Sequence, residues 1–162
     1  MMQPKYDASL LFVCLGNICR SPVAEAVCRQ YVTRMNLNIR CDSAGLHDYH
    51  KGALPDSRTL KNAALHQLDM SGIRSRKITV NDGNQWDYII AMDHSVYEQL
   101  KTQFPAQAQP NVLYEFMAFN PQAQWLEVPD PYYGTAKDFE LVYELCVSTM
   151  PWIVQKVKSA ML

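Results

Sequence analysis

Apolar positions along the chain follow two spacings, one typical of strands and one typical of helices. Ser9–Cys14 is a short apolar run, which predicts a strand, and apolar residues then recur at helical spacing from Pro22 to Met35. Ser21 can cap free amides and Pro22 tolerates the first helical position, so a helix is expected to begin there. The sequence therefore predicts a strand, a loop and a helix in succession.

The same alternation continues toward the C-terminus. Further strands are expected at Asn38–Ser43, Trp86–Met92 and Val112–Tyr114. Further helices are expected at three places: from about Asp56, with Leu60, Ala64 and Leu68 buried, at His94–Phe104, and at Ala136–Met161. Pro151 is expected to kink the last helix or split it in two. Strands that alternate with helices predict a parallel sheet and the α/β fold class.

Two segments lack either spacing. Leu46–Pro55 is expected to be a loop, and Glu115–Thr135 contains three prolines and a glycine with little periodicity. A connection as long as the second is usually functional or disordered in a compact domain. We expect it to be functional.

Length, composition and charge narrow the class of protein. The chain has 162 residues, of which 48% are hydrophobic, which suits one domain over residues 1–162, with residues 1–8 as a flexible N-terminal extension. The net charge of -1 and the absence of a Lys/Arg run disfavour a nucleic-acid partner. No apolar run is expected to act as a signal peptide or to cross a membrane.

The cysteine content indicates a reducing compartment. Five cysteines form an odd set in a chain with no expected export signal, which favours free thiols over a disulfide framework. The cytoplasm is therefore the expected location. Cys28, Cys41 and Cys146 are expected to be core residues.

The segment Cys14–Ser21 has the residues of an anion-binding loop. It joins the first strand to the first helix, where open α/β sheets bind ligands. Inward amides before a helix N-terminus make a concave anion site, and Gly16 and Asn17 are suited to the left-handed backbone that such a turn needs. Arg20 adds a planar fork that matches two phosphate oxygens. The segment predicts a phosphate site.

Cys14 lies at the start of this loop, where the same field favours a thiolate. A thiolate beside a bound phosphoryl group can attack phosphorus and form a cysteinyl phosphate, which water then hydrolyses. The alternatives are a small buried apolar cysteine, a zinc ligand, or, for Arg20, a surface ion pair. They are less favoured because Gly, Asn, Arg and Ser-Pro all fall where a phosphate loop needs them, and no Gly-Lys-Ser/Thr of a nucleotide loop follows.

Four motifs together resemble a known family. Cys14-x5-Arg20-Ser21-Pro22 is followed by Asp42-Ser43-Ala44-Gly45, Ala91-Met92-Asp93 and Asp130-Pro131-Tyr132-Tyr133-Gly134. From about Leu10 to the C-terminus the chain resembles the low-molecular-weight protein tyrosine phosphatases. The resemblance implies a three-layer sandwich, with a four-stranded parallel sheet of order 2-1-3-4 flanked by helices and a phosphate-binding loop after strand 1. It implies a cysteine-dependent enzyme without metal or cofactor, active on phosphotyrosine and on aryl phosphates.

The resemblance also assigns roles to residues. Cys14 is the nucleophile, Arg20 binds phosphate, and Asp130 is the acid that protonates a leaving phenolate, whose conjugate acid has a pKa of about 10. An alternative for Asp130 is an ordinary turn former before proline, and for the tyrosines it is loop packing. Substrate-binding residues by resemblance are Leu15, Gly16, Asn17, Ile18, Cys19, Ser21, Tyr49, Tyr132 and Tyr133, supported by Ser43 and Asp93.

Two positions depart from the family pattern, and one cysteine suggests redox control. Val96 stands where the family often has asparagine, and the histidine often found after Gly-Ile is missing after Gly72-Ile73, so the supporting network cannot be carried over there. Cys19 resembles the cysteine with which relatives form a reversible disulfide to the nucleophile. A reactive Cys14 is the partner that would be oxidised.

The expected partners are phosphotyrosine proteins and small aryl phosphates, with inorganic phosphate and other oxyanions as competitors. Weak self-association through the active-site face stays open. Rival functions on the same fold are arsenate reduction, which needs further cysteines, and protein-arginine phosphatase activity. Arginine phosphatases tend to have threonine where Ile18 stands and to lack the paired tyrosines. A phosphate-binding module without activity is the rival from another class.

Overall fold

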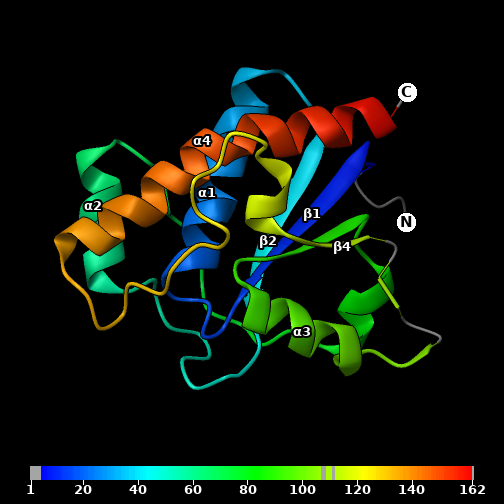
Figure 1. Ribbon diagram of the computed structural model, residues 1–162, viewed down its shortest axis with the longest axis horizontal. Coiled ribbons are helices and arrows are strands. Elements are labelled where there is room, and N and C mark those ends of the chain that lie inside the picture. The colour runs from blue at the N-terminus through cyan, green and yellow to red at the C-terminus, as the bar shows by residue number, and fades with distance from the viewer. Residues whose placement is uncertain (1–4, 107–108, 111, 162) are drawn as a thin grey trace.

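The computed structural model describes residues 5–106, 109–110 and 112–161. Four parallel strands form one sheet in the order β2-β1-β3-β4 (Figure 1). The strands are β1 (Ala8–Cys14), β2 (Ile39–Gly45), β3 (Tyr88–Ala91) and β4 (Leu113–Glu115). The expected class, strand order and strand direction are confirmed.

Helices cover both faces of the sheet. On one face lie α1 (Arg20–Arg34) and α4 (Ala136–Ala160), with α2 (Ser57–Leu65) packed against α4 (Figure 1). On the other face lie α3 (His94–Gln103) and the short 3-10 helix η1 (Val80–Asn84), while a second one, η3 (Phe116–Phe119), follows β4. The result is the expected three-layer sandwich.

The central strand shows why the sheet lies between two layers. Along β1, Leu10 and Phe12 pack into the core beneath α1 and α4, whereas Leu11 and Val13 pack into the core beneath α3. Successive side chains of a strand point to opposite faces, so a strand with both faces covered is apolar throughout. The C-terminal end of this strand carries Cys14 to the edge where α1 begins.

Several expected details differ. The strand β1 begins at Ala8, so the last residue of the expected N-terminal extension belongs to the sheet, and residues 1–4 lie outside the described part of the chain. In α2 the buried residues are Thr59 and Ala63, and Ala64 is exposed, because α4 covers the other side of this helix.

Pro151 does not split the last helix, since α4 runs unbroken from Ala136 to Ala160. Proline removes the hydrogen bond to the carbonyl four residues earlier, here that of Val147. Both residues are exposed, so water can satisfy that carbonyl. Among the described residues, no helix combines the length and apolar character needed to cross a bilayer.

Asp82 joins η1 to the chain around it. This buried carboxylate accepts hydrogen bonds from Arg76 (3.1 and 3.2 Å), from the Thr79 amide (2.8 Å) and from the Trp86 indole (3.0 Å). Burial by itself would raise the pKa of Asp82, but the bonds from Arg76, Thr79 and Trp86 outweigh it and hold the pKa below its ordinary value. Asp82 therefore stabilises the fold while it is ionised.

The variant Asp82→Asn is expected to lower the free energy of unfolding at pH 7 by about 2 kcal/mol, the usual worth of charge-assisted hydrogen bonds. The folded-state pKa is depressed, so this stabilisation is present above the unfolded pKa of about 3.9 and is lost as pH falls through the folded value. Urea unfolding at several pH values measures the difference. The exposed Asp48→Asn is the control, and a wild-type advantage that does not shrink in acid would contradict this account.

Candidate active site

The loop between β1 and α1 turns its carbonyls outward. The carbonyls of Leu15, Gly16 and Ile18 accept hydrogen bonds from the Leu46 amide (2.9 Å), the Ser75 hydroxyl (3.1 Å) and the Asp56 amide (2.9 Å). In a planar trans peptide the N–H points opposite to the C=O. The amides that follow these carbonyls therefore face the inside of the loop, where an anion would bind.

Asn17 supplies the left-handed residue of the loop, with φ of 56°. Its side-chain amide donates to the hydroxyls of Ser21 (2.8 Å) and Ser43 (3.0 Å), and its carbonyl accepts from the Arg76 amide (3.0 Å). Gly16 does not have a positive φ, so that expectation is wrong. A Cβ atom there would lie 3.3 Å from the ring of His50, a close approach that a small shift of that ring would relieve.

Buried polar side chains form a hydrogen-bond network beside Cys14. Asn17 uses both side-chain hydrogens as donors, and the hydroxyl of Ser43 donates to the buried Glu25 (2.6 Å). The hydroxyl of Ser21 accepts from Asn17 and lies 2.9 Å from Cys14 Sγ and 3.4 Å from the Ala44 carbonyl, so its hydrogen has two acceptors within reach. The Asn17 backbone amide donates to the same sulfur (3.3 Å). The Asn17 amide and the Ser21 hydroxyl are therefore the two groups that can donate to Cys14 Sγ.

Arg20 is held at the side of the loop with its side chain 4% exposed. Its Nη1 donates to Asp93 (2.5 Å) and to the Val128 carbonyl (3.1 Å), and its Nη2 lies 3.8 Å from Asp130 Oδ2. Burial would lower the pKa of Arg20, but Cys14 and Asp93 raise it above its ordinary value. The guanidinium stays charged, and Arg20 lines the same hollow as Cys14.

These groups line a hollow of about 280 Å³. The expected residues that line it are Cys14, Leu15, Gly16, Ile18, Cys19, Arg20, Tyr49, Asp130, Tyr132 and Tyr133. The other expected residues do not line the hollow. Asn17, Ser21 and Ser43 are buried, and Asp93 contacts Arg20. Tyr49 and Tyr133 are 81% and 96% exposed, so their rings stand at the rim. The hollow has a polar floor and aromatic walls.

Two lining residues were not predicted. His47 and His50 also line the hollow, and the His47 ring packs on Tyr49 with 4.0 Å between ring centroids. Burial and the neighbouring His50 lower the pKa of His47. Their position on either side of Tyr49, in a loop without periodicity, was the available sequence signal.

Asp130 lies at the mouth of the hollow on the long loop. Its Oδ1 accepts a hydrogen bond from the Tyr132 amide (3.1 Å), and its side chain is 47% exposed. The loop then enters α4 through Gly134, where a Cβ atom would collide with the Asp138 side chain that caps the helix. The carboxyl group can thus reach a substrate whose phosphoryl group lies above Cys14.

The cysteines differ in chemistry. Cys19 lines the same hollow as Cys14, but burial and the nearby Asp56 raise the pKa of Cys19 to about 12, so it stays a neutral thiol. Cys28, Cys41 and Cys146 are free and buried, which confirms them as core residues. Within the described residues, no group of three or more His, Cys, Asp or Glu side chains could hold a metal ion.

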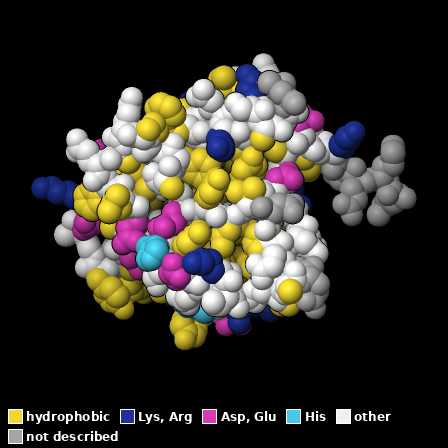
Figure 2. Space-filling view, turned by 45° about the vertical axis from the view of Figure 1, so that its right-hand side comes forward, with side chains coloured by type: hydrophobic (Ala, Val, Ile, Leu, Met, Phe, Trp, Pro, Cys, Tyr) yellow, Lys and Arg dark blue, Asp and Glu magenta, His cyan; other side chains and the backbone are white. Residues whose placement is uncertain are grey.

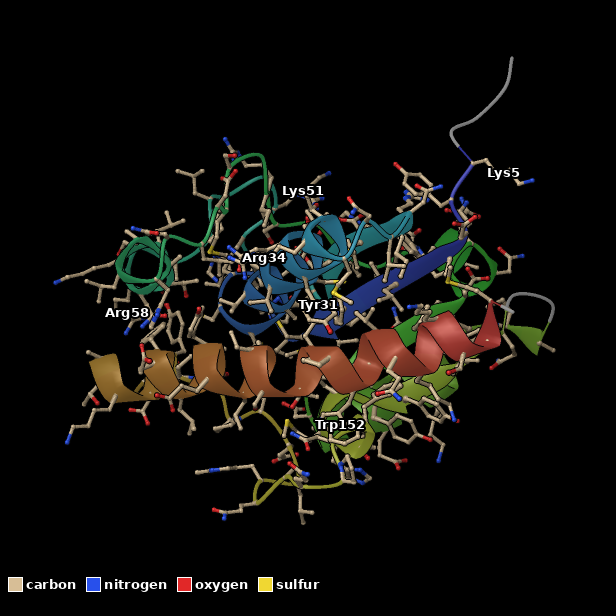
Figure 3. All side chains as sticks on the ribbon, turned by 90° about the horizontal axis from the view of Figure 1, so that it is seen from above. Lys5, Tyr31, Arg34, Lys51, Arg58 and Trp152 are labelled. Atoms are coloured by element: carbon tan, nitrogen blue, oxygen red, sulfur yellow. The ribbon has the colours of Figure 1, made fainter. Side chains whose placement is uncertain are left out.

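A larger hollow of about 470 Å³ lies elsewhere, between α4 and η3, with Tyr114, Phe119 and Trp152 in its walls. Trp152 lies on the side of α4 that faces η3 (Figure 3). Hydrophobic side chains gather in the middle of the molecular face shown in Figure 2. The lining contains neither a cysteine nor a carboxylate.

Comparison with known proteins decides the family. The model of the low molecular weight phosphotyrosine protein phosphatases matches residues 9–161. A human protein of that name is 44% identical over 149 residues, which are 90% of this chain and 93% of the relative. The chain belongs to this family.

Solved structures of the family share the fold. A protein tyrosine phosphatase from Entamoeba histolytica, with Hepes in its active site, superposes with a TM-score of 0.88 at 37% identity, covering 96% of this chain and 99% of that one. A Drosophila arginine phosphatase superposes with a TM-score of 0.86 at 28% identity, covering 92% and 97%. The fold alone therefore does not distinguish these two substrates.

The two departures from the family pattern have local explanations in this phosphatase. At the position of the missing histidine, the backbone amide of Arg76 donates to Asn17. At Val96 the contact is also made by the backbone. The Val96 amide donates to Asp93 Oδ1 (2.8 Å), and Asp93 thereby caps α3. In both places the hydrogen bond is therefore made by the backbone.

Proposed function

We propose that this chain is a protein tyrosine phosphatase that hydrolyses phosphotyrosine through a cysteinyl-phosphate intermediate. The observation that carries the proposal is the placement of Cys14, whose sulfur contacts the Asn17 amide and the Ser21 hydroxyl, at the floor of a hollow lined by Arg20 and, at the mouth, by Asp130. A nucleophile, an oxyanion site and an acid are the parts that phosphoryl transfer requires.

In the first step, the loop amides and Arg20 bind the phosphate oxygens and Cys14 Sγ attacks phosphorus. The bond from phosphorus to the phenolic oxygen breaks, and Asp130 gives its proton to that oxygen. In the second step, the Asp130 carboxylate takes a proton from water as water attacks the cysteinyl phosphate. Inorganic phosphate leaves and Cys14 returns to the thiolate. Phosphate and similar oxyanions are expected to compete for the loop.

The aromatic rim supports an aryl substrate. The Tyr132 and Tyr133 rings meet edge to face at 5.0 Å and line the hollow together with Tyr49, and such rings can stack on a phenyl ring. The apolar Ile18 also lines the hollow. These features favour phosphotyrosine over phosphoarginine, whose leaving group is a planar cation. Small aryl phosphates would fit the same hollow.

The test is hydrolysis of matched peptides carrying phosphotyrosine, phosphoserine or phosphoarginine, together with para-nitrophenyl phosphate. Phosphotyrosine is expected to give the highest kcat/KM among the peptides. A higher kcat/KM for phosphoarginine would show that phosphoarginine is the preferred substrate and would leave the proposed mechanism unchanged. Phosphate binding without turnover of any substrate would identify a binding module instead.

The free cysteines support the proposal that the protein acts in a reducing compartment such as the cytoplasm. We also propose that Cys19 protects the nucleophile. Peroxide would oxidise the Cys14 thiolate to a sulfenic acid, and the Cys19 thiol would condense with it, releasing water and forming a disulfide. Activity of the wild type is expected to return fully on adding dithiothreitol after peroxide. The variant Cys19→Ser is expected to recover several-fold less, and equal recovery of the two proteins would refute the protective role.

A further inference from the structure

Arg58 connects the helix α2 to the loop that carries Asp130. It lies in the first turn of α2, and in Figure 3 it stands between α2 and the N-terminal end of α4. Its Nη1 donates to the Tyr132 carbonyl (2.8 Å), and its guanidinium lies 5.3 Å from the Tyr132 ring and 4.7 Å from the Phe139 ring. One side chain thus makes three contacts with the segment that follows Asp130.

The other side of the same guanidinium is connected to the phosphate loop through Asp56. Nε and Nη2 of Arg58 donate to the two carboxylate oxygens of Asp56 (3.0 and 2.9 Å). The backbone amide of Asp56 in turn donates to the carbonyl of Ile18 (2.9 Å), within the Cys14 loop. The bonds from Arg58 hold the pKa of Asp56 below its ordinary value, so the pair stays ionised at neutral pH. Arg58 therefore bridges the two loops of the site.

The contact at Tyr132 bears directly on the acid. The Tyr132 amide donates to Asp130 Oδ1, which leaves Oδ2 as the oxygen nearest Arg20 and the hollow. The position of the Tyr132 backbone consequently sets the orientation of the carboxyl group. Arg58 fixes that backbone through the carbonyl of the same residue.

We propose that Arg58 is a positioning residue for the general acid: it holds the Asp130 loop at a fixed distance from the phosphate loop through Tyr132 on one side and Asp56 on the other. The inference rests on the proposed function, because it concerns the acid of that reaction. Arg58 itself does not line the hollow, so it is not a catalytic residue.

A purely structural ion pair predicts something different. Exposed pairs contribute little to stability, and losing one would change activity equally for all substrates or not at all. Losing the position of an acid has a selective effect, because a poor leaving group depends on protonation and a good one does not. The dependence of kcat/KM on the pKa of the leaving phenol therefore separates the two roles.

The experiment measures kcat/KM for a series of aryl phosphates with leaving phenols from acidic to weakly acidic. For Arg58→Met we expect a loss of about tenfold or more with the poorest leaving group, as small misplacements cost up to about 100-fold, and little loss with the best one. Arg34→Met, which removes an exposed arginine from α1, is the matched control and should match wild type throughout. The best leaving group also reports that the variant is folded.

A double variant completes the test. In the Asp130→Ala background, Arg58→Met is expected to cause no further loss, because both changes remove the same interaction. A uniform loss across the series, or an equal loss with and without Asp130, would overturn the positioning role and leave the phosphatase assignment intact. If Asp130→Ala itself left the leaving-group dependence unchanged, the acid assignment would fall and this inference with it.

Discussion

Replacing Cys14 with serine is expected to abolish turnover of para-nitrophenyl phosphate and phosphotyrosine peptides, a loss of about 10⁵-fold or more, as for removal of other covalent nucleophiles. The hydroxyl of serine ionises far less readily than a thiol, and the two groups that contact Sγ, the Ser21 hydroxyl and the Asn17 amide, are too few to make up the difference. The inward amides and Arg20 remain in place, so the variant should still bind inorganic phosphate.

Cys146→Ser is the control for this prediction, because Cys146 is buried in α4 and does not line the hollow. It should lower stability, since a hydroxyl replaces a thiol in the core, yet keep the activity of the folded protein. Measurable turnover by Cys14→Ser would exclude the mechanism in which Cys14 is the covalent nucleophile. Loss of both phosphate binding and turnover would show instead that the variant had disturbed the loop.

Asp130→Ala is expected to lower kcat for phosphotyrosine by about 10²–10⁴, the usual contribution of a positioned acid. The wild-type pH profile of kcat/KM should be bell-shaped, because the first step needs Cys14 ionised and Asp130 protonated together. The variant should lose the alkaline limb, which reports ionisation of Asp130, and keep the acidic limb. Steady-state rates across the pH range provide the measurement.

The matched control is Asp48→Ala, which removes an exposed carboxylate from the loop beside Tyr49. It should change neither limb. A variant at Asp130 with an intact alkaline limb, or one that slows good and poor leaving groups equally, would assign the proton transfer to another group.

The predictable part of this molecule is the part that local sequence specifies. The apolar run that ends at Cys14 and the helical spacing after Pro22 determine a strand, a turn and a helix without distant contacts, and the loop with its nucleophile follows from them. The expected cap is wrong: α1 begins at Arg20, and the Ser21 hydroxyl contacts Asn17 and Cys14 rather than capping the helix. Alternation of strands and helices likewise implied a parallel sheet. The strand order and the role of Asp130 came from resemblance to the family.

The remaining features depend on packing that the sequence does not encode locally. The burial of Ala63 in place of Ala64 depends on where α4 crosses α2, and the unbroken α4 depends on which side of the helix Pro151 faces. Gly16 was expected to be left-handed, whereas only Asn17 in this loop has a positive φ, and the histidine rings that lie close to Gly16 come from a segment about 30 residues away. No local sequence pattern pointed to Arg58, because its hydrogen bond to Tyr132 joins residues that are 74 positions apart.

The most direct test of the account is to stop the reaction of wild-type protein with para-nitrophenyl phosphate in acid within milliseconds and to map the phosphoryl group by peptide mass spectrometry. The account predicts one phosphoryl group on the peptide that contains Cys14, bound to its sulfur and absent when Cys14 is serine. A phosphoryl group on any other residue, or a burst of para-nitrophenol with an unmodified Cys14, would contradict it.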